Sequence, residues 1–289
     1  MNRDAHDASP HGAFFMRRPG KMRFLPGGFP HDGIIAWRDW TACPRHELGK
    51  NEVGKSGDEV YRLTSGARNF YLKVKRIGKE AAAETLRRES EVLNWLKGRL
   101  PVPEAVCYHQ DRSKEYLLIT EVPGFAAMET GWDKKKVVCR LAEGLRRIHS
   151  LPIDSCPFVY PTGALIRLAA ERIRAGLVDE EDFDECRKGK RAEELYEELV
   201  RSRPARDDLV FTHGDYCLPN VILSDSGIGG FIDWGRGGVA DRYRDLGIAA
   251  RSITHNLGEG YVPYFFGFYG LKRVDFKKVK FFQLMDEFF

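Results

Sequence analysis

A short segment at residues 211–223 reads FTHGDYCLPNVIL and sets polar side chains between two apolar runs. Asp215 follows the first run, and Asn220 lies five positions further along the chain. A second carboxylate, Asp233, follows the apolar pair at 231–232. Short apolar runs bounded by turn residues are typical of buried strands. We therefore expect two carboxylates and one amide to lie at strand ends and to face one cleft.

These residue types suit phosphoryl transfer, in which the protein mainly aligns a hydroxyl group with a phosphate and neutralises developing charge. One carboxylate must accept or orient the hydroxyl proton, and further oxygen atoms must hold a divalent metal ion across the phosphates. Each residue alone would more often be a helix cap or part of an Asx-turn. The three together, in this order and beside apolar strands, favour a phosphotransferase site.

The composition is that of a globular protein, with 43% hydrophobic and 30% charged residues in a chain of 289. This length allows one large domain or two lobes around a cleft. No apolar run approaches the roughly 20 residues of a membrane-spanning helix, and the polar start lacks the apolar core of a signal peptide. We therefore expect a cytoplasmic protein without a membrane partner.

Charge and cysteine spacing exclude two further classes of protein. The net charge of +4 is too small to indicate a nucleic-acid partner, and the basic residues form no single tract. The six cysteines are scattered, and no CxxC pair occurs. This spacing predicts free thiols rather than a zinc site or a disulfide framework.

The first half of the chain reads mainly as strands. Residues 1–30 show no sustained periodicity and are expected to form a disordered tail. Alternating runs at 59–66 and 69–76 predict a hairpin that turns near Ser65-Gly66. Further expected elements are a helix at 81–98, with its apolar face at Leu86, Leu93 and Leu96, and strands at 104–110 and 115–121.

From residue 122 onward the hydrophobic periodicity is helical. Asp133 can cap a helix whose apolar residues recur at helical spacing as far as Ile148. Further helices are expected near 163–176 and 190–202. The pattern predicts an α+β protein, with a strand-rich N-terminal lobe and a mainly helical C-terminal lobe.

The segment at 49–56, GKNEVGKS, matches the phosphate-loop pattern GxxxxGK[ST] letter for letter. That pattern is meaningful only between a buried strand and a helix. Here TACPRHEL precedes it, which is no apolar strand, and EVYRL follows it, which alternates like a strand. We expect a glycine-rich turn that covers nucleotide phosphates, with the Ser56 hydroxyl as a donor. A plain surface turn is the alternative.

Lys73 lies mid-strand between apolar neighbours, and Glu89 lies on the helix that follows. An ion pair between the two would position the α- and β-phosphates of a nucleotide. The spacing identifies the elements but does not show that the side chains meet. A lysine on the solvent face of its strand is the alternative.

Taken together, these residues resemble the aminoglycoside 3'-phosphotransferases, antibiotic-resistance kinases of the protein-kinase-like superfamily. The likeness extends from about residue 37 to the last residue. HGD with a spaced Asn also occurs in choline, homoserine and macrolide kinases, whereas GRGGVADRYRDL and the terminal DEFF are far more specific. Other segments that carry the likeness are VGKSGDEVYRL, FYLKV, RRESEVLNWL, LPVPE, RRIHSLPIDSCPF, GLVDEEDFDE, VFTHGDYCLPNVIL and GFIDWG.

The resemblance implies a two-lobed protein-kinase-like fold that transfers the γ-phosphate of ATP, with GTP as the alternative nucleotide, to a 3'-hydroxyl. It implies a nucleotide-binding lobe with its hinge at 31–122 and a catalytic and substrate-binding lobe at 123–289. Asp215 would be the catalytic base, and Asn220 and Asp233 would hold Mg²⁺. The residues implied for the nucleotide are Ser56, Tyr71, Lys73, Glu89, Thr120, Glu121 and Val122. Those implied for the aminoglycoside are Asp184, Glu185, Arg236, Arg251, Asp286, Glu287 and Phe289.

The implied substrate site agrees with the charge pattern. DEEDFDE at 179–185 and DEFF at 286–289 gather negative charge on a mildly basic protein, as a polycationic aminoglycoside requires. A solvated acidic turn is the alternative for the first of these segments. The resemblance also implies a monomer or a weak dimer.

Three residues depart from the family pattern and bear on the range of drugs. Trp234 stands where relatives more often carry a small or aliphatic residue, and we expect it to reshape the pocket beside the metal site. His255 and Asn256 stand where several relatives carry acids, which would remove one ammonium contact.

Two other functions compete with an aminoglycoside kinase. A kinase for another small alcohol or amine would share the phosphotransferase residues, and drug-dependent release of ADP would separate the two. A catalytically inactive binding module is expected to lack the base, the metal ligands or the lysine. All of these are present in the chain. A protein kinase is disfavoured because no APE-type segment follows Asp233.

Overall fold

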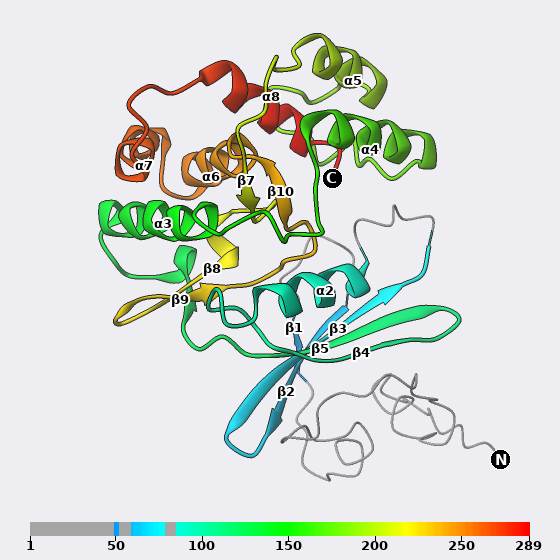
Figure 1. Cartoon of the computed structure of the whole chain (residues 1–289), viewed down its shortest axis with the longest axis vertical. Coiled ribbons are helices and arrows are strands. Elements are labelled where there is room, and N and C mark those ends of the chain that lie inside the picture. The colour runs from blue at the N-terminus through cyan, green and yellow to red at the C-terminus, as the bar shows by residue number, and fades with distance from the viewer. Residues whose placement is uncertain (1–48, 52–58, 79–84) are drawn as a thin grey trace, which may run out of the picture. The chain divides into compact units, whose positions relative to one another are not determined.

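The computed structural model describes residues 49–51, 59–78 and 85–289, which fall into two compact units (Figure 1). The smaller unit contains the chain up to Arg76 together with 105–121, and the larger contains 77–104 and 122–289. This grouping assigns the helix at 86–96 to the larger unit, whereas the predicted lobe boundary at 122 keeps it in the first lobe. The predicted tail at 1–30 and Ser56 lie outside the described residues.

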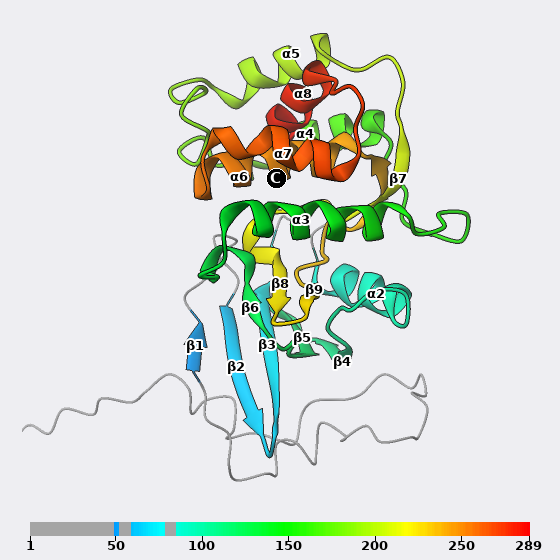
Figure 2. The ribbon, with the colours of Figure 1, turned by 90° about the vertical axis from the view of Figure 1, so that its left-hand side faces the viewer.

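The smaller unit is an antiparallel sheet of five strands in the order β1-β2-β3-β5-β4 (Figure 2). Alternation along β3 buries Phe70, Leu72 and Val74 on one face and places Tyr71 and Lys73 on the other. The strands are β1 (Gly49–Asn51), β2 (Glu59–Ser65), β3 (Arg68–Arg76), β4 (Ala105–Gln110) and β5 (Lys114–Thr120). The face that buries Phe70 forms the core of this unit.

The hairpin of β2 and β3 closes as the sequence predicts. Ser65 pairs with Arg68, and the turn between them contains Gly66 at φ 61°. This left-handed conformation favours glycine, because a side chain there meets the backbone. The predicted strands and the position of their turn are confirmed.

The larger unit is mainly helical (Figure 1). Its helices are α2 (Leu86–Leu96), α3 (Lys134–His149), α4 (Thr162–Ala175), α5 (Ala192–Arg201), α6 (Tyr243–Asn256), α7 (Val262–Tyr269) and α8 (Phe276–Asp286). Its short 3₁₀ turns are η3 (Ala127–Glu129), η4 (Leu218–Asn220) and η5 (Glu259–Tyr261). Helix α3 packs against α7, and α6 packs against α8. The helices predicted near 163–176 and 190–202 are α4 and α5.

Two small sheets complete the larger unit. Strands β6 (Phe125–Ala126), β8 (Val221–Ser224) and β9 (Gly227–Phe231) form the first, and β7 (Leu209–Thr212) pairs antiparallel with β10 (Gly238–Asp241) in the second. The strands β7, β8 and β9 match the apolar runs of the sequence, whereas β10 was not predicted. The ends of β7 and β9 lead directly into the loops that carry Asp215 and Asp233.

The helix starts follow from their capping residues. The Asp133 carboxylate accepts hydrogen bonds from the Lys135 and Lys136 amides at 3.0 and 3.2 Å, which confirms the predicted cap of α3. Thr85 caps α2 in the same way, accepting from the Arg88 amide at 3.1 Å. None of the described helices is long and apolar enough to cross a lipid bilayer.

Candidate active site

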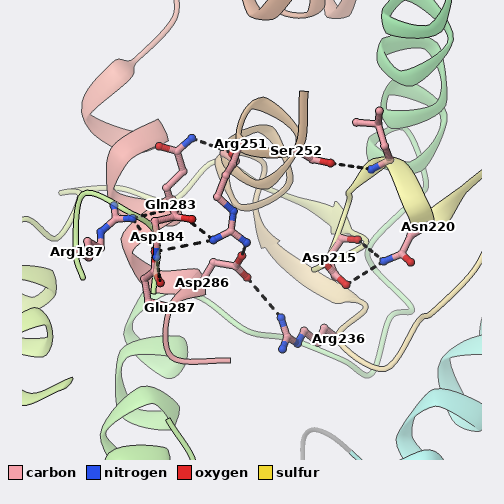
Figure 3. A network of polar contacts seen from close by, with 12 residues as sticks. Asp184, Arg187, Asp215, Asn220, Arg236, Arg251, Ser252, Gln283, Asp286 and Glu287 are labelled. Atoms are coloured by element: carbon pink, nitrogen blue, oxygen red, sulfur yellow. Dashed lines mark hydrogen bonds and ion pairs between the residues drawn. The ribbon is translucent and has the colours of Figure 1, made fainter. Parts of the chain in front are cut away.

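Asp215 and Asn220 face each other across the loop between β7 and β8 (Figure 3). The Asn220 Nδ2 atom donates to the Asp215 Oδ2 atom at 2.9 Å and to the Asp215 carbonyl at 3.0 Å. Both hydrogens of the amide thus point toward Asp215, which leaves the Oδ1 atom for a different partner. The structure confirms that these two predicted residues meet.

His213, two residues before Asp215, is a neutral imidazole fixed in one tautomer. Its Nε2 atom lies 3.0 Å from the Ile232 carbonyl, which can only accept, so Nε2 carries the hydrogen. Its Nδ1 atom then accepts from the Asp215 amide at 3.3 Å. Burial lowers the pKa of His213, because the charged form would lose its hydration. The ring therefore links the loop that carries Asp215 to the loop that carries Asp233.

Asp245 holds the loop that leads to Asp215 through hydrogen bonds to its backbone. Its side chain is fully buried at the start of α6 and accepts from the His213 amide at 2.7 Å and from the Gly214 amide at 2.8 Å. The His149 Nε2 atom lies 3.0 Å from the same carboxylate. Burial alone would raise the pKa of Asp245, but these hydrogen bonds and the nearby imidazoles outweigh it, so the pKa is lowered. The loop before Asp215 is thus pinned by a buried anion.

A second tether holds η4, the turn that ends at Asn220. The Leu218 amide donates to the Ser252 Oγ atom at 3.0 Å, and the Asn256 Nδ2 atom donates to the Ser252 carbonyl at 2.8 Å. Ser252 lies next to Arg251 on α6. The same helix therefore carries a tether for the predicted metal ligand and a predicted substrate residue.

Asp233 lies at the end of β9 and is exposed. Its φ of 65° is left-handed, a conformation that short polar residues tolerate better than branched ones. The Trp234 ring that follows is fully buried, lies 4.3 Å from His213 between ring centroids, and donates to the Phe231 carbonyl at 3.0 Å. The ring packs beneath the loops of the site, and the expectation that Trp234 reshapes the pocket stays a prediction.

Burial raises the pKa of Asp215, and the Asp286 and Asp233 carboxylates raise it further, while the Arg236 guanidinium opposes them. A carboxylate with a raised pKa holds a proton more strongly and so is a better general base. The Asp233 and Asp286 carboxylates therefore repel the negative charge of ionised Asp215.

Asp286 joins the site to a network of arginines and acids (Figure 3). The Arg236 Nη1 atom lies 3.4 Å from the Asp286 Oδ1 atom, and Arg251 donates to Oδ2. Arg251 also lies 3.6 Å from the Asp184 Oδ2 atom. One guanidinium on α6 therefore reaches acids on the 176–191 loop and at the C-terminal end of the chain.

Glu287 and Asp184 are bridged by Arg187, a residue that the sequence did not single out. The Arg187 Nη1 atom lies 2.7 Å from the Glu287 Oε1 atom and 3.1 Å from the Asp184 Oδ2 atom. The Glu287 side chain is only 2% exposed. Burial and the neighbouring Asp184 carboxylate raise the pKa of Glu287 to about 7, against the opposing effect of Arg187 and Arg251. A further cation at this place would favour the ionised form.

Two of the predicted substrate residues differ in their placement. Phe289 lies within the network, because its ring is near the Arg172 and Arg236 guanidinium groups, 5.6 and 5.7 Å from centroid to Cζ. The Glu185 side chain is 85% exposed and pairs with Lys188 instead. The structure does not bring Glu185 into the network. His255, where the family pattern has an acid, is exposed.

In the smaller unit, Tyr71 and Glu121 lie together. The Glu121 carboxylate accepts from Asn69 at 2.7 Å, from Arg62 at 3.0 Å and weakly from the Tyr71 hydroxyl at 3.4 Å. The Glu121 amide donates to the Asn69 carbonyl at 3.1 Å. The Glu121 amide is therefore already paired within the smaller unit. Thr120 ends β5, in register with Phe70.

The remaining predicted nucleotide residues are described within their own units. Lys73 is half-buried on β3, on the same sheet face as Tyr71. Glu89 is 3% exposed on α2, and Val122 belongs to the larger unit with it. The pairing of Lys73 with Glu89 stays a prediction.

Comparison with known proteins shows the family of this chain. The model of the phosphotransferase enzyme family matches residues 50–282. An aminoglycoside 3'-phosphotransferase of Niallia circulans is 40% identical over 251 residues, which cover 84% of this chain and 93% of the relative. The chain belongs to the aminoglycoside 3'-phosphotransferase family.

Solved structures of the family share the fold. The crystal structure of an aminoglycoside-3'-phosphotransferase of type VIII is 37% identical with a TM-score of 0.77, covering 86% of this chain and 95% of that one. An aminoglycoside phosphotransferase of Streptomyces rimosus in complex with ADP and streptomycin is 25% identical with a TM-score of 0.68, covering 82% and 94%. The predicted α+β fold of the protein-kinase-like kind and the phosphotransferase class are confirmed.

Within this family site, the sequence did not assign roles to Asp245, Arg187 and Ser252. Asp245 stands in the quoted segment GRGGVADRYRDL, so its position was noticed without its contacts. Its partners His213 and Gly214 lie 32 and 31 positions away, and local spacing carries no information about such distant contacts. Helix α6, on which Asp245 lies, was not among the predicted helices, so the motif itself was the only signal that the sequence offered.

A Gly214→Ala substitution is expected to lower kcat about 10-fold and to destabilise the fold by about 2 kcal/mol, because a left-handed non-glycine residue is strained. Gly214 has φ 85°, and a Cβ atom there would overlap the Arg236 carbonyl, lying 2.8 Å from its carbon. Urea unfolding and steady-state kinetics measure both effects. Gly267→Ala is the matched control, since a Cβ at Gly267 has open space around it. Equal behaviour of the two variants would show that the close approach at Gly214 is unimportant.

Proposed function

We propose that this protein transfers the γ-phosphate of ATP to the 3'-hydroxyl of an aminoglycoside antibiotic and so confers resistance to it. The observation that carries the proposal is the continuity of the site within the larger unit. The Asp215 loop contacts Arg236 through Gly214, and Arg236 pairs with Asp286. A base for a hydroxyl group and a cluster of acids for ammonium groups thus belong to one connected set of residues.

Asp215 is the proposed base. Its raised pKa favours uptake of the proton from the acceptor hydroxyl, and the Asn220 amide holds the carboxylate in one orientation. The fixed carboxylate also reduces the reorganisation that the transfer step would otherwise require. Asp215 orients the hydroxyl oxygen toward the phosphate as it takes the proton.

The donor set fits Mg²⁺. Asn220 turns its Oδ1 atom away from Asp215, and Asp233 supplies an exposed carboxylate, so both offer the hard oxygen atoms that this ion prefers. Magnesium bound there would neutralise charge on the nucleotide phosphates. Lys73, paired with Glu89, and Ser56 are the proposed contacts to the phosphates. Tyr71, Thr120, Glu121 and Val122 are the proposed contacts to the base.

Asp184, Asp286 and Glu287 are the proposed ligands of the ammonium groups. In the structure their charge is balanced by Arg187, Arg236 and Arg251. An arriving ammonium group therefore enters a set of acids that already holds cations, and its charge favours ionised Glu287. Phe289 closes the site at the end of the chain. The cytoplasm, where ATP is available, is the proposed compartment, and a monomer the simplest state.

Release of ADP with kanamycin and with tobramycin tests the function. Tobramycin lacks the 3'-hydroxyl, so we expect turnover with kanamycin and none with tobramycin. Tobramycin should instead inhibit the kanamycin reaction competitively, because its ammonium groups still bind. Turnover with neither drug would contradict an aminoglycoside substrate, and equal turnover with both would contradict the 3' position.

A further inference from the structure

One buried arginine on α4 contacts both of the segments that carry the substrate acids. Arg172 is 8% exposed, and its Nε atom donates to the Phe288 carbonyl. Its Nη2 atom donates to the Leu177 carbonyl at 3.1 Å. Phe288 precedes the C-terminal residue, and Leu177 begins the loop that leads to Asp184. A single guanidinium thus joins two segments that are 111 positions apart in sequence, from 177 to 288.

The end of α4 fixes the first of these segments. Gly176 is left-handed at φ 67°, and the Leu177 amide donates back to the Arg172 carbonyl at 2.9 Å. This closing pattern is typical of helices that end at glycine. Leu177 is therefore bound to Arg172 twice, through its amide by the Arg172 backbone and through its carbonyl by the side chain. The loop toward Asp184 leaves the helix in a fixed direction.

The C-terminal segment is fixed from two sides. The Arg172 Cζ atom lies 5.6 Å from the centroid of the Phe289 ring, and the Arg236 Cζ atom lies 5.7 Å from it. Phe288 is fully buried and packs edge-on against Tyr196 at 6.3 Å. Aromatic faces attract guanidinium groups at such distances. Asp286 and Glu287 are therefore followed by a tail whose backbone and last ring both contact arginines.

We propose that Arg172 is a positioning residue for substrate recognition, which holds the C-terminal acids and the Asp184 loop at the spacing that the ammonium groups require. The inference rests on the proposed function, because it takes these acids to be the substrate ligands. The planar guanidinium is suited to the task, since it donates in two directions at once and stays charged when buried. In this role Arg172 acts through the two segments that it holds and not on the reacting hydroxyl.

An Arg172→Met variant is expected to raise the KM and the calorimetric Kd for kanamycin about 10- to 100-fold, the range for losing hydrogen bonds from a charged group. The KM for ATP and the kcat at saturating kanamycin should change by less than about 3-fold, because the hydrogen bonds of Arg172 to Phe288 and Leu177 hold the acid-bearing segments rather than the reacting group. The Kd of Arg172→Lys for kanamycin should lie between those of the wild type and of Arg172→Met. Lysine keeps the positive charge but lacks the planar guanidinium that donates in two directions.

Arg174→Met is the matched control. Arg174 lies on the same helix, is exposed, and donates to the Ala170 carbonyl within α4 at 3.3 Å. This variant should bind kanamycin as the wild-type protein does. In a protein that lacks Phe289, Arg172→Met should weaken kanamycin binding by a smaller factor than in the full chain. The contact between Arg172 and the Phe289 ring is already absent there.

The outcomes separate the inference from the proposed function. If the wild-type protein neither binds nor phosphorylates kanamycin, the proposed function fails whatever the variants do. If it does both, and Arg172→Met or Arg172→Lys keeps the wild-type Kd for kanamycin, the positioning role is overturned. Equal losses for kanamycin and ATP would also overturn it, since they would indicate a general loss of structure. If Arg172→Met does not fold, Arg172→Lys is tested in its place. Its Kd for kanamycin is compared with that of the wild type, and its loss for kanamycin is compared with its loss for ATP.

Discussion

An Asp215→Asn variant is expected to phosphorylate kanamycin about 1000-fold more slowly than the wild-type protein, the usual size of a lost general base. Asparagine keeps the shape of the side chain and still offers Oδ1 to the Asn220 amide, whose contact with Asp215 is 2.9 Å. What it loses is the charge that takes up the hydroxyl proton. The Kd for ATP should stay equal or fall, because a negative charge near the phosphates is removed.

Single-turnover kinetics and calorimetry with ATP measure the two quantities separately. Asp225→Asn is the control, since Asp225 lies in the exposed turn between β8 and β9. It should retain full activity. A kcat for Asp215→Asn within about 10-fold of the wild-type value would be too small a loss for a general base and would remove Asp215 from that role.

The second large effect is expected at Asp245. An Asp245→Asn variant should lose about 3 kcal/mol of unfolding free energy, the cost of breaking a buried, hydrogen-bonded charge. The carboxylate accepts from the His213 and Gly214 amides, while an Asn side chain must turn its own NH₂ toward one of these donors. The loop before Asp215 would then lose one tether, so kcat should fall as well.

Denaturant unfolding gives the stability, and kcat measured well below the unfolding midpoint gives the effect on the loop. Asp225→Asn again serves as the surface control. An Asp245→Asn protein as stable and as active as the wild type would show that the loop is held by other contacts.

Local spacing predicted those parts of the fold that local chemistry determines. The hairpin of β2 and β3 follows from alternation and from a glycine at the one turn position with positive φ. The α3 cap follows from Asp133, because an aspartate side chain can reach the first free amides of its own helix. Asp215 and Asn220 meet because they lie only five positions apart in one short loop.

The remaining features depend on contacts between distant segments, which spacing does not encode. Asp184 faces the arginines while its neighbour Glu185 is 85% exposed, and this difference is set by the path of the 176–191 loop. The burial of Trp234 depends on aromatic partners from β7 and β9. Strand β10 is only 4 residues long and exists because β7 pairs with it.

The acids of the site are also neutralised by arginines that composition could not assign. Arg187, Arg236 and Arg251 each pair with a carboxylate proposed for the substrate. The acid side of these pairs is buried, with the Glu287 and Asp286 side chains 2% and 8% exposed, so leaving either acid without a cation would be costly. A substrate ammonium group that displaces a guanidinium must therefore keep the acid paired.

The position of the transferred phosphate tests the central claim most directly. Kanamycin should be incubated with the protein and ATP, and the purified product examined by ¹H–³¹P correlation NMR. We expect one phosphorus signal coupled to the proton on the 3' carbon. Coupling to a proton at any other ring position, or recovery of unmodified kanamycin beside released ADP, would contradict it.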